Sequence, residues 1–433
     1  MRIHAALGFG RPRAALASRR TRATLAALLA LVLAAVALGG YEYQRNRTGS
    51  IYHPHARFLP QPTPTLPAGG RERFAWPLYG YDKAHTRFFP APASVRPPFR
   101  RLWARGEGSL LEFPPVLYGK RLFQLDDSAT LIATDKRTGR TLWTRRLGQA
   151  SASAPAVTSN TVYATILSSG HPHSPGRVVA LNSATGAMRW FRSLPAPSES
   201  SPLLGDGRVF FGTQSGLVYA LNDRTGQVVW TYRAPGSVKA SPTLADGMLY
   251  FGDYSGHVQA ISEQSGSRVW ISGSGGALFG NGTFYSTAAV AYGRVFLGNT
   301  DGRVYAYDAF TGGLDWAVQT GNYVYASPAI TNAPGLGPTV YVGSYSGTFF
   351  AINARSGHVS WKFNARGRIS GSATIVGQLV YFADLAQHRT YGLGVSTGRK
   401  LFEMQTGAFD PVISDGTNVY LTGTTGLYAL APR

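Results

Sequence analysis

The stretch YALNDRTGQVVW, residues 219–230, is one of seven similar copies along the chain. Each copy places a Thr-Gly or Ser-Gly pair shortly before an aromatic residue, and most begin with Asn or Asp three residues before the Thr or Ser. The aromatic positions are Trp143, Trp190, Trp230, Trp270, Trp316, Trp361 and Phe402. They lie 40 to 47 residues apart. Repetition at this period indicates a solenoid or a propeller.

The residues around the Thr-Gly pair indicate β-structure. Apolar runs such as VYAL and VVW flank a turn in which Asn or Asp bonds nearby backbone and Gly accepts a positive φ. Two further strands precede each such hairpin, for example within SPTLADGMLYFGDYSGHVQAI. Four short strands per repeat predict the blade of a β-propeller. The frequent Gly and Pro residues and the lack of a long 3.6-residue period after residue 40 argue against helical repeats.

Both ends of the repeat region contribute to one further blade. The chain ends in a third strand, TGLYALAPR, and the repeat region begins with an unpaired Trp strand, RPPFRRLWARG. Trp103 lies 40 residues before Trp143 and therefore belongs to the same period. We expect an all-β propeller of eight four-stranded antiparallel blades over residues 96–433, with the strand of Trp103 paired to Leu427–Leu430. Such closure leaves no open edge between the two chain ends.

The A-x-[DN]-x-x-[TS]-G-x-x-x-W repeat resembles that of the pyrroloquinoline-quinone (PQQ)-like propeller family. This family includes quinoprotein alcohol dehydrogenases and BamB-like outer-membrane assembly lipoproteins. The resemblance covers roughly residues 96 to 433 and implies the fold. It is compatible with redox enzymes and with scaffolds, because one fold serves several functions.

The N-terminus predicts a membrane segment. Residues 23–40 form an uncharged apolar run that follows a basic tail, residues 1–22. The positive-inside rule retains the tail in the cytoplasm, so residues 23–40 are predicted as a transmembrane signal anchor with the propeller on the extracytoplasmic side of the cell membrane. The alternative is a secreted protein cleaved near Ala35-Val36-Ala37, which fits a signal-peptidase site. The lipoprotein cysteine of BamB-like proteins is missing, since the chain contains no cysteine.

Composition narrows the choice of partners. The absence of cysteine excludes disulfides, thiolate metal sites and covalent c-type haem. The formal net charge of +21 is concentrated partly in the tail and spacer and is compatible with anionic wall polymers. We expect envelope proteins or such polymers as partners, no nucleic acid, and a monomer.

Residues 41–95 link the anchor to the propeller. Their first part is a Pro-rich polar spacer. The following segment contains Trp76, Gly80, Asp82 and Arg87 and is similar to the W-x-x-x-G-x-D-x-x-x-x-R segment that precedes the first blade of quinoprotein dehydrogenases. The resemblance is compatible with a purely packing role.

Variable loops identify a candidate binding surface. Blade topology places the Thr-Gly turns on one face, and the loops between second and third strands on the other face, together with the links between blades. Insertions on this second face, at Ser168–Gly176 and after Trp270, contrast with the uniform turns. The predicted contact residues are Ser168–Gly176, Phe279, Phe284, Tyr285, Tyr323 and Tyr325. The His171 and His173 pair, like His53 and His55, has metal-ligand spacing, but no carboxylates accompany it, and we expect no metal.

The central channel is the second candidate site. Alignment of the first strands on their Ser-Pro step brings Glu112 and Asp410 to the channel. If the chain were a quinoprotein, the resemblance would assign both to PQQ and calcium binding. Calcium requires six to eight oxygen ligands, and the repeats and the leading segment account for every Trp that could cover a quinone. We therefore expect no catalytic residues and no cofactor, and a non-catalytic binding scaffold at the cell envelope. The alternative is a PQQ-dependent dehydrogenase that oxidises alcohols or sugars.

Overall fold

The computed structural model describes residues 24, 26–39, 50–51, 56–61, 74–106, 108–173, 175–274 and 282–433. The chain divides into two units, Met1–Thr48 and Gly49–Arg433. In the first unit, residues 26–39 are helical. Among the described residues, no helix combines the length and the apolar character that a membrane crossing needs.

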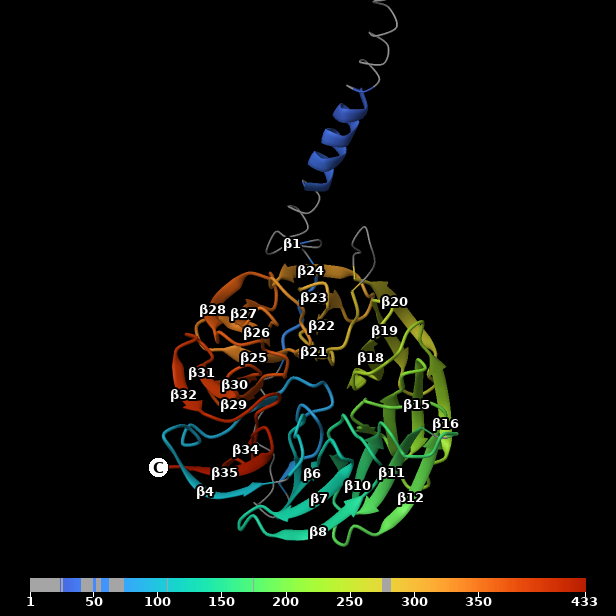
Figure 1. Cartoon of the computed structure of the whole chain (residues 1–433), viewed down its shortest axis with the longest axis vertical. Coiled ribbons are helices and arrows are strands. Elements are labelled where there is room, and N and C mark those ends of the chain that lie inside the picture. The colour runs from blue at the N-terminus through green and yellow to red at the C-terminus, as the bar shows by residue number, and fades with distance from the viewer. Residues whose placement is uncertain are drawn as a thin grey trace, which may run out of the picture. The chain divides into compact units, whose positions relative to one another are not determined.

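The second unit is an eight-bladed β-propeller (Figure 1). Seven blades are continuous in sequence, and each runs from an inner first strand to an outer fourth strand. Blade 1 consists of β5 (Val116–Tyr118), β6 (Arg121–Leu125), β7 (Thr130–Asp135) and β8 (Thr141–Arg146), and blade 2 of β9 (Ala156–Val157), β10 (Thr161–Ile166), β11 (Gly176–Asn182) and β12 (Met188–Leu194). Blade 3 consists of β13 (Leu203–Gly205), β14 (Arg208–Gly212), β15 (Leu217–Asn222) and β16 (Val228–Arg233), and blade 4 of β17 (Thr243–Ala245), β18 (Met248–Gly252), β19 (His257–Ser262) and β20 (Arg268–Gly273). Blade 5 consists of β21 (Ala289–Ala291), β22 (Arg294–Gly298), β23 (Arg303–Asp308) and β24 (Leu314–Gln319). Blade 6 consists of β25 (Ala329–Ala333), β26 (Gly337–Gly343), β27 (Thr348–Asn353) and β28 (Val359–Asn364), and blade 7 of β29 (Thr374–Val376), β30 (Leu379–Asp384), β31 (Arg389–Gly394) and β32 (Lys400–Met404).

Blade 8 joins the two ends of the repeat region. Its strands are β33 (Val412–Ser414), β34 (Val419–Thr422), β35 (Gly426–Pro432) and, from the start of the region, β4 (Phe99–Gly106). β4 pairs antiparallel with β35, and Trp103 lies opposite Ala429. The predicted number of blades and the predicted closure are confirmed.

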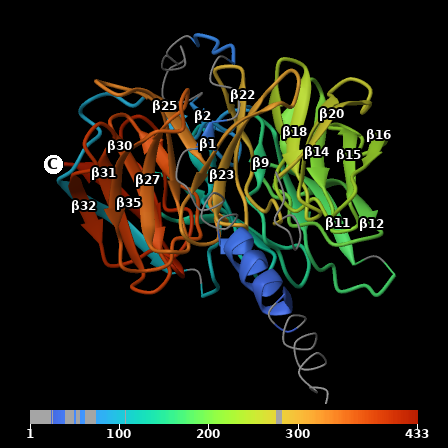
Figure 2. The same cartoon turned by 90° about the horizontal axis from the view of Figure 1, so that it is seen from above.

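Seen edge-on, the strands run between two faces of the ring (Figure 2). We call the face with the Thr-Gly turns the turn face. The opposite face, which carries the links between blades and the loops between second and third strands, is the link face.

Each repeated tryptophan fastens its blade to the next one. The seven indole N–H groups donate to a backbone carbonyl in the following blade at 2.9–3.2 Å, as Trp190 does to Asp223. In the same contact, the ring covers the glycine of the next Thr-Gly pair, for example Gly226. Phe402 is the exception that the topology explains. The next blade is blade 8, whose third and fourth strands come from different ends of the chain, so no Thr-Gly turn joins them.

Part of the predicted spacer is bound to blade 5. β1 (Ser50–Ile51) pairs with the outer edge of β24. The N–H of Leu59 donates to the carbonyl of Tyr292 at 3.0 Å, and the ring of Phe58 stacks on that of Tyr292 with centroids 4.9 Å apart. These residues therefore pack as part of the propeller.

The leading segment enters the central channel. β2 (Ala75–Trp76) pairs with β5, and β3 (Phe88–Phe89) pairs in parallel with β29. Between them, backbone carbonyls accept hydrogen bonds from the first strands of four further blades, at Val157, Leu244, Val290 and Ile330. The predicted boundary at residue 96 thus falls inside one packed unit, Gly49–Arg433.

Candidate functional site: the central pocket

A ring of eight short side chains, six of them polar, surrounds the channel where the first strands begin. It occupies the position that immediately precedes the Pro of the Ser-Pro step, and its members in blade order are Pro114, Ala154, Ser201, Ser241, Thr287, Ser327, Ser372 and Asp410. Backbone N–H groups donate to the side chain of the neighbouring blade, as Thr287 does to Ser327 Oγ at 3.0 Å and Ser327 to Ser372 Oγ at 3.0 Å. The hydroxyls therefore join blades, and their primary role is structural.

Asp410 occupies this ring in blade 8. One carboxylate oxygen accepts the N–H of Ser372, and the other lies 3.7 Å from Nη1 of Arg87. Both side chains are almost fully buried, with 1% of Arg87 and 4% of Asp410 exposed. Burial raises the pKa of Asp410, although Arg87, Tyr79 and Ser372 favour its ionised form. This ion pair connects the leading segment to blade 8.

The leading segment delivers three side chains to the channel. Gly80, with φ of +79°, and a turn closed by the Asp82 carboxylate on Thr86 aim them inward. The Tyr79 hydroxyl bonds Ser372 Oγ at 3.0 Å, and the Arg87 guanidinium lies 4.0 Å from the centre of the Tyr79 ring. His85 Nδ1 bonds Thr243 Oγ1 at 2.8 Å, and burial, assisted by Arg87, lowers the His85 pKa to about 3.

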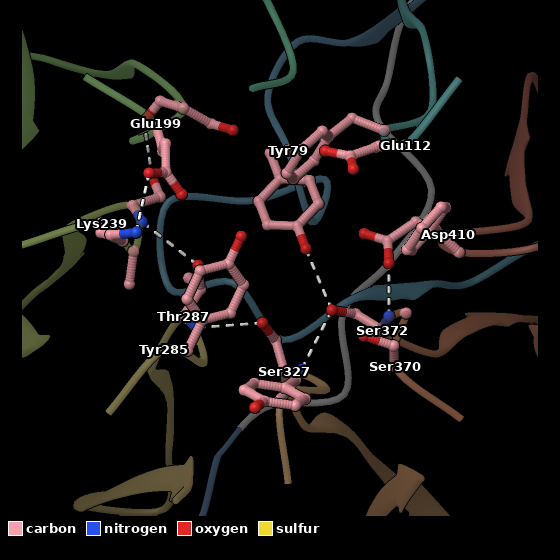
Figure 3. A pocket seen from close by; sticks show the side chains of 17 residues that line it. Tyr79, Glu112, Glu199, Lys239, Tyr285, Thr287, Ser327, Ser370, Ser372 and Asp410 are labelled. Carbon is pink, nitrogen blue, oxygen red and sulfur yellow. Dashed lines mark hydrogen bonds and ion pairs between the residues drawn. The ribbon is translucent and has the colours of Figure 1, made fainter. Parts of the chain in front are cut away.

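A cavity of about 80 Å³, open to solvent on one side, lies on the link-face side of the ring (Figure 3). A second set of side chains lines it, and its members are Glu112, Glu199, Lys239, Tyr285, Tyr325 and Ser370. These are six of the eight positions two residues before the ring. The alignment of first strands names the same six residues.

The carboxylates of the pocket differ in their partners. Glu199 pairs with Lys239 at 2.9 Å and accepts a hydrogen bond from Gln214 at 2.5 Å. Glu112 has neither a hydrogen bond nor an ion pair within the described part of the chain. Burial raises the pKa of Glu112, and the nearby Asp127, Glu199 and Asp410 raise it further.

Five tyrosines form a continuous cluster at the pocket mouth. We call Tyr254, Tyr285, Tyr323, Tyr325 and Tyr345 the tyrosine cluster. Neighbouring ring centroids lie 5.3–6.4 Å apart, mostly in tilted or edge-to-face geometry, which aromatic rings prefer. Lys239 lies 4.8 Å from the ring centre of Tyr254, and the Arg368 guanidinium lies 5.4 Å from that of Tyr345.

The predicted contact residues differ in their location and exposure. Tyr285 and Tyr325 line the pocket, and Tyr323 is 49% exposed beside them. The expectation of exposure does not hold for Phe284, which is fully buried against Tyr305. Its position matches that of Val238 and Val324 in neighbouring blades, and each of these residues fills the space above a glycine. Phe279 and Ser174 lie outside the described residues.

The remaining predicted sites are separate from the pocket. His171 and His173 lie in the loop between β10 and β11 of blade 2 and do not line the pocket. Among the described residues, no group of three or more His, Cys, Asp or Glu side chains could hold a metal ion. His53 and His55 lie outside the described residues.

Four members of the site were missed from the sequence. Tyr79 and His85 lie within the leading segment, whose entry into the channel no local pattern indicates. Tyr254 and Tyr345 carried a usable signal, because both precede Ser-Gly in the loop between second and third strands. Blade 3 has Gln214 at this position.

The residues present do not fit a calcium-bound quinone. Of the three pocket carboxylates, Glu199 is paired with Lys239 and Asp410 with Arg87. A calcium ion takes six to eight oxygen ligands, several of them carboxylate. The residues that line the pocket include tyrosine and phenylalanine but no tryptophan to cover a quinone ring.

Comparison with known proteins gives a family and a fold. A family model described as outer membrane protein assembly factor BamB (PQQ_2) matches residues 98–170, 174–323 and 329–432. Similar solved structures include BamB from Moraxella catarrhalis, with 16% identity, a TM-score of 0.62 and coverage of 77% of this chain and 99% of that one. A europium-containing methanol dehydrogenase has 13% identity, a TM-score of 0.67 and coverage of 83% and 98%. The quinohemoprotein alcohol dehydrogenase from Comamonas testosteroni has 15% identity, a TM-score of 0.68 and coverage of 82% and 80%. The sequence has no significant match among curated proteins.

Proposed function

The chain belongs to the PQQ-like repeat propeller family described as outer membrane protein assembly factor BamB, and from this premise we propose that it is a non-catalytic scaffold that binds protein partners at the cell envelope. The observation that carries the proposal is the tyrosine cluster on the link face. Tyrosine provides a large, rigid contact area with a polar end and is enriched at the energetic centres of protein interfaces. The family description as an assembly factor supports protein partners over small substrates.

The chemistry of the pocket supports a binding role. Two of its three carboxylates are neutralised by neighbouring cations, and the hydroxyl ring is used to join blades. A general base or metal ligand needs a side chain that is free to exchange protons or donate a lone pair. Only Glu112 meets this condition among the described carboxylates of the pocket.

We propose further that residues 23–40 anchor the protein in the cell membrane, with the propeller on the extracytoplasmic side. Support comes from the apolar run and from the arginines of the preceding tail. N-terminal sequencing of protein isolated from membranes should find the tail intact. A mature N-terminus just after Ala37 would replace the anchor with a cleaved signal.

Partner capture by the full-length protein tests the scaffold role. The double variant Tyr323→Ala, Tyr325→Ala should weaken binding of envelope proteins about tenfold or more, because aromatic residues at interface centres contribute most of the binding energy. The matched control is Phe310→Ala, which removes a 47% exposed aromatic ring from the turn face. If both variants and the wild type captured equal amounts of envelope proteins, the tyrosine cluster would be excluded as the contact surface.

A further inference from the structure

The pocket has one carboxylate in excess of its cations. Its lining contains the carboxylates of Glu112, Glu199 and Asp410 and the cation Lys239, and the Arg87 guanidinium contacts Asp410. Lys239 is paired with Glu199 and Arg87 with Asp410, which leaves the negative charge of Glu112 uncompensated. A partly buried carboxylate among other carboxylates is stabilised when a cation arrives. The site is therefore locally acidic within a chain of formal net charge +21.

A buried acceptor in the same pocket also lacks a hydrogen bond. Oδ2 of Asp410 has no hydrogen-bond partner among the described residues, and only 4% of this side chain is exposed. The Arg87 contact at 3.7 Å is an ion pair and too long for a hydrogen bond. Buried polar atoms in native proteins are nearly always hydrogen-bonded. Asp410 and Glu112 both line the cavity and lie on the same side of it (Figure 3).

The walls of the pocket already bind cations. The Arg87 guanidinium lies 4.0 Å from the ring centre of Tyr79, and the Lys239 ammonium lies 4.8 Å from that of Tyr254. Both distances are within the range in which the ring quadrupole attracts a cation. Tyr285 and Tyr325 line the same cavity, yet no described cation lies over either ring. The parts of these two rings that line the cavity offer a surface for a further cation and the apolar stem that carries it.

We propose that the central pocket receives a lysine or arginine side chain of the protein partner, with its charge at Glu112 and Asp410 and its stem along Tyr285 and Tyr325. This inference rests on the scaffold function, because it specifies the partner bound at the link face. The positively charged surface of this protein repels a basic side chain of the partner, but physiological salt limits this repulsion to a distance of about 8 Å.

The affinity of the pocket for a basic side chain should increase as the pH rises. Glu112 binds a cation only when ionised, and its pKa in the free protein is raised by burial and by Asp127, Glu199 and Asp410. The nearby cations are Arg87 and Lys239, which are paired with Asp410 and Glu199, and Arg368, which lies over the Tyr345 ring. A cation lowers the Glu112 pKa, so affinity rises as pH rises through the pKa of the free protein and is lost on acidification. Glu112→Gln should weaken this dependence, and Asp410, whose pKa burial also raises, accounts for what remains.

Small probes test the pocket independently of the partner. Binding of Nα-acetyl-lysine amide and Nα-acetyl-arginine amide to the full-length protein is measured by ligand-observed NMR titration. Uncharged Nα-acetyl-norleucine amide is the reference ligand. Both basic probes should bind about tenfold or more tightly than norleucine, and Glu112→Gln should abolish this preference while Glu112→Asp retains part of it. Asp206→Asn, which removes an exposed carboxylate on the turn face, is the matched control.

Several outcomes would overturn the inference. They are equal binding of basic and uncharged probes, an unchanged preference in folded Glu112→Gln, or calcium binding that displaces the probes. These results leave the scaffold function standing if the tyrosine double variant still loses partner capture. If Glu112→Gln lost both partner capture and the preference for basic probes, the result would support the scaffold function and the binding of a basic side chain in the pocket.

Discussion

The glycine of each Thr-Gly pair meets two demands at once. Its φ lies between +66° and +74°, a region that favours glycine, and an added Cβ would lie 2.6–3.1 Å from the tryptophan of the preceding blade. The tryptophan needs this flat contact to bring its N–H within reach of the next backbone carbonyl. The motif therefore forms a contact between two neighbouring blades, and each repeat contributes one such contact.

Gly226→Ala tests this contact. The methyl group would meet the Trp190 ring at 2.6 Å, so we expect the free energy of unfolding to fall by about 2–4 kcal/mol, from backbone strain and overpacking together. Gly207→Ala is the control, because Gly207 has a similar φ of +72° and no atom within 4 Å of the added Cβ. It should cost only the backbone term of about 1–2 kcal/mol. Equal losses in chemical denaturation would mean that the tryptophan contact has no packing role.

Short elements outside the repeats bind the propeller at three blades. β2 and β3 extend the inner edges of blades 1 and 7, and β1 extends the outer edge of blade 5. β24, which β1 covers, contains Asp315, buried in an ion pair with Arg294 at 2.5 Å. Arg294 also lies 4.9 Å from the centre of the Phe58 ring. The spacer thus covers a charged pair that would otherwise be more open to water.

Phe58→Ala should release the spacer from blade 5. The substitution removes the stack on Tyr292 and the contacts of the ring with Arg294 and Arg355, which together are worth about 1–3 kcal/mol. Limited trypsin digestion should then cleave after Arg57 several times faster, because a protease acts on the undocked segment. Phe310→Ala, which lies far along the chain in a turn of the same blade, should leave this rate unchanged. An unchanged rate in Phe58→Ala would show that β1 alone holds the segment.

At the scale of the whole molecule, one fold is compatible with a scaffold and with a dehydrogenase. The similar structures include both BamB and quinoprotein dehydrogenases at 13–16% identity, so the fold alone does not separate them. The separation depends on the few side chains that project into the channel. In this chain they form internal ion pairs and a tyrosine wall.

Purified protein mixed with pyrroloquinoline quinone and Ca²⁺ should show no tight binding and no dye-linked oxidation of alcohols or sugars. Glu112 is the one pocket carboxylate without a cation partner among the described residues, and it cannot supply several oxygen ligands and a catalytic base together. Equilibrium dialysis of the quinone and a dye-reduction assay provide the measurement. Micromolar binding that is lost in Glu112→Gln, accompanied by substrate-dependent dye reduction, would establish the dehydrogenase instead.

The sequence by itself determined the ring. Eight blades, the pairing of Trp103 beside Leu427–Leu430 and the alignment of Glu112 and Asp410 on the channel all follow from a period of about forty residues. The physical reason is repetition, because the same strands, turns and contacts between blades occur many times and each copy reinforces the prediction.

Only the tertiary structure decided what the channel contains. Arg87 meets Asp410, and Tyr254 and Tyr345 join Tyr285 and Tyr325, through contacts that each occur once and join residues distant in sequence. The burial of Phe284 and the contacts of Ser50–Ile51, Phe58 and Leu59 with blade 5 are of the same kind. Such contacts depend on the particular side chains that the closed ring brings together, and because each contact occurs only once, the repeat period gives no prediction of it.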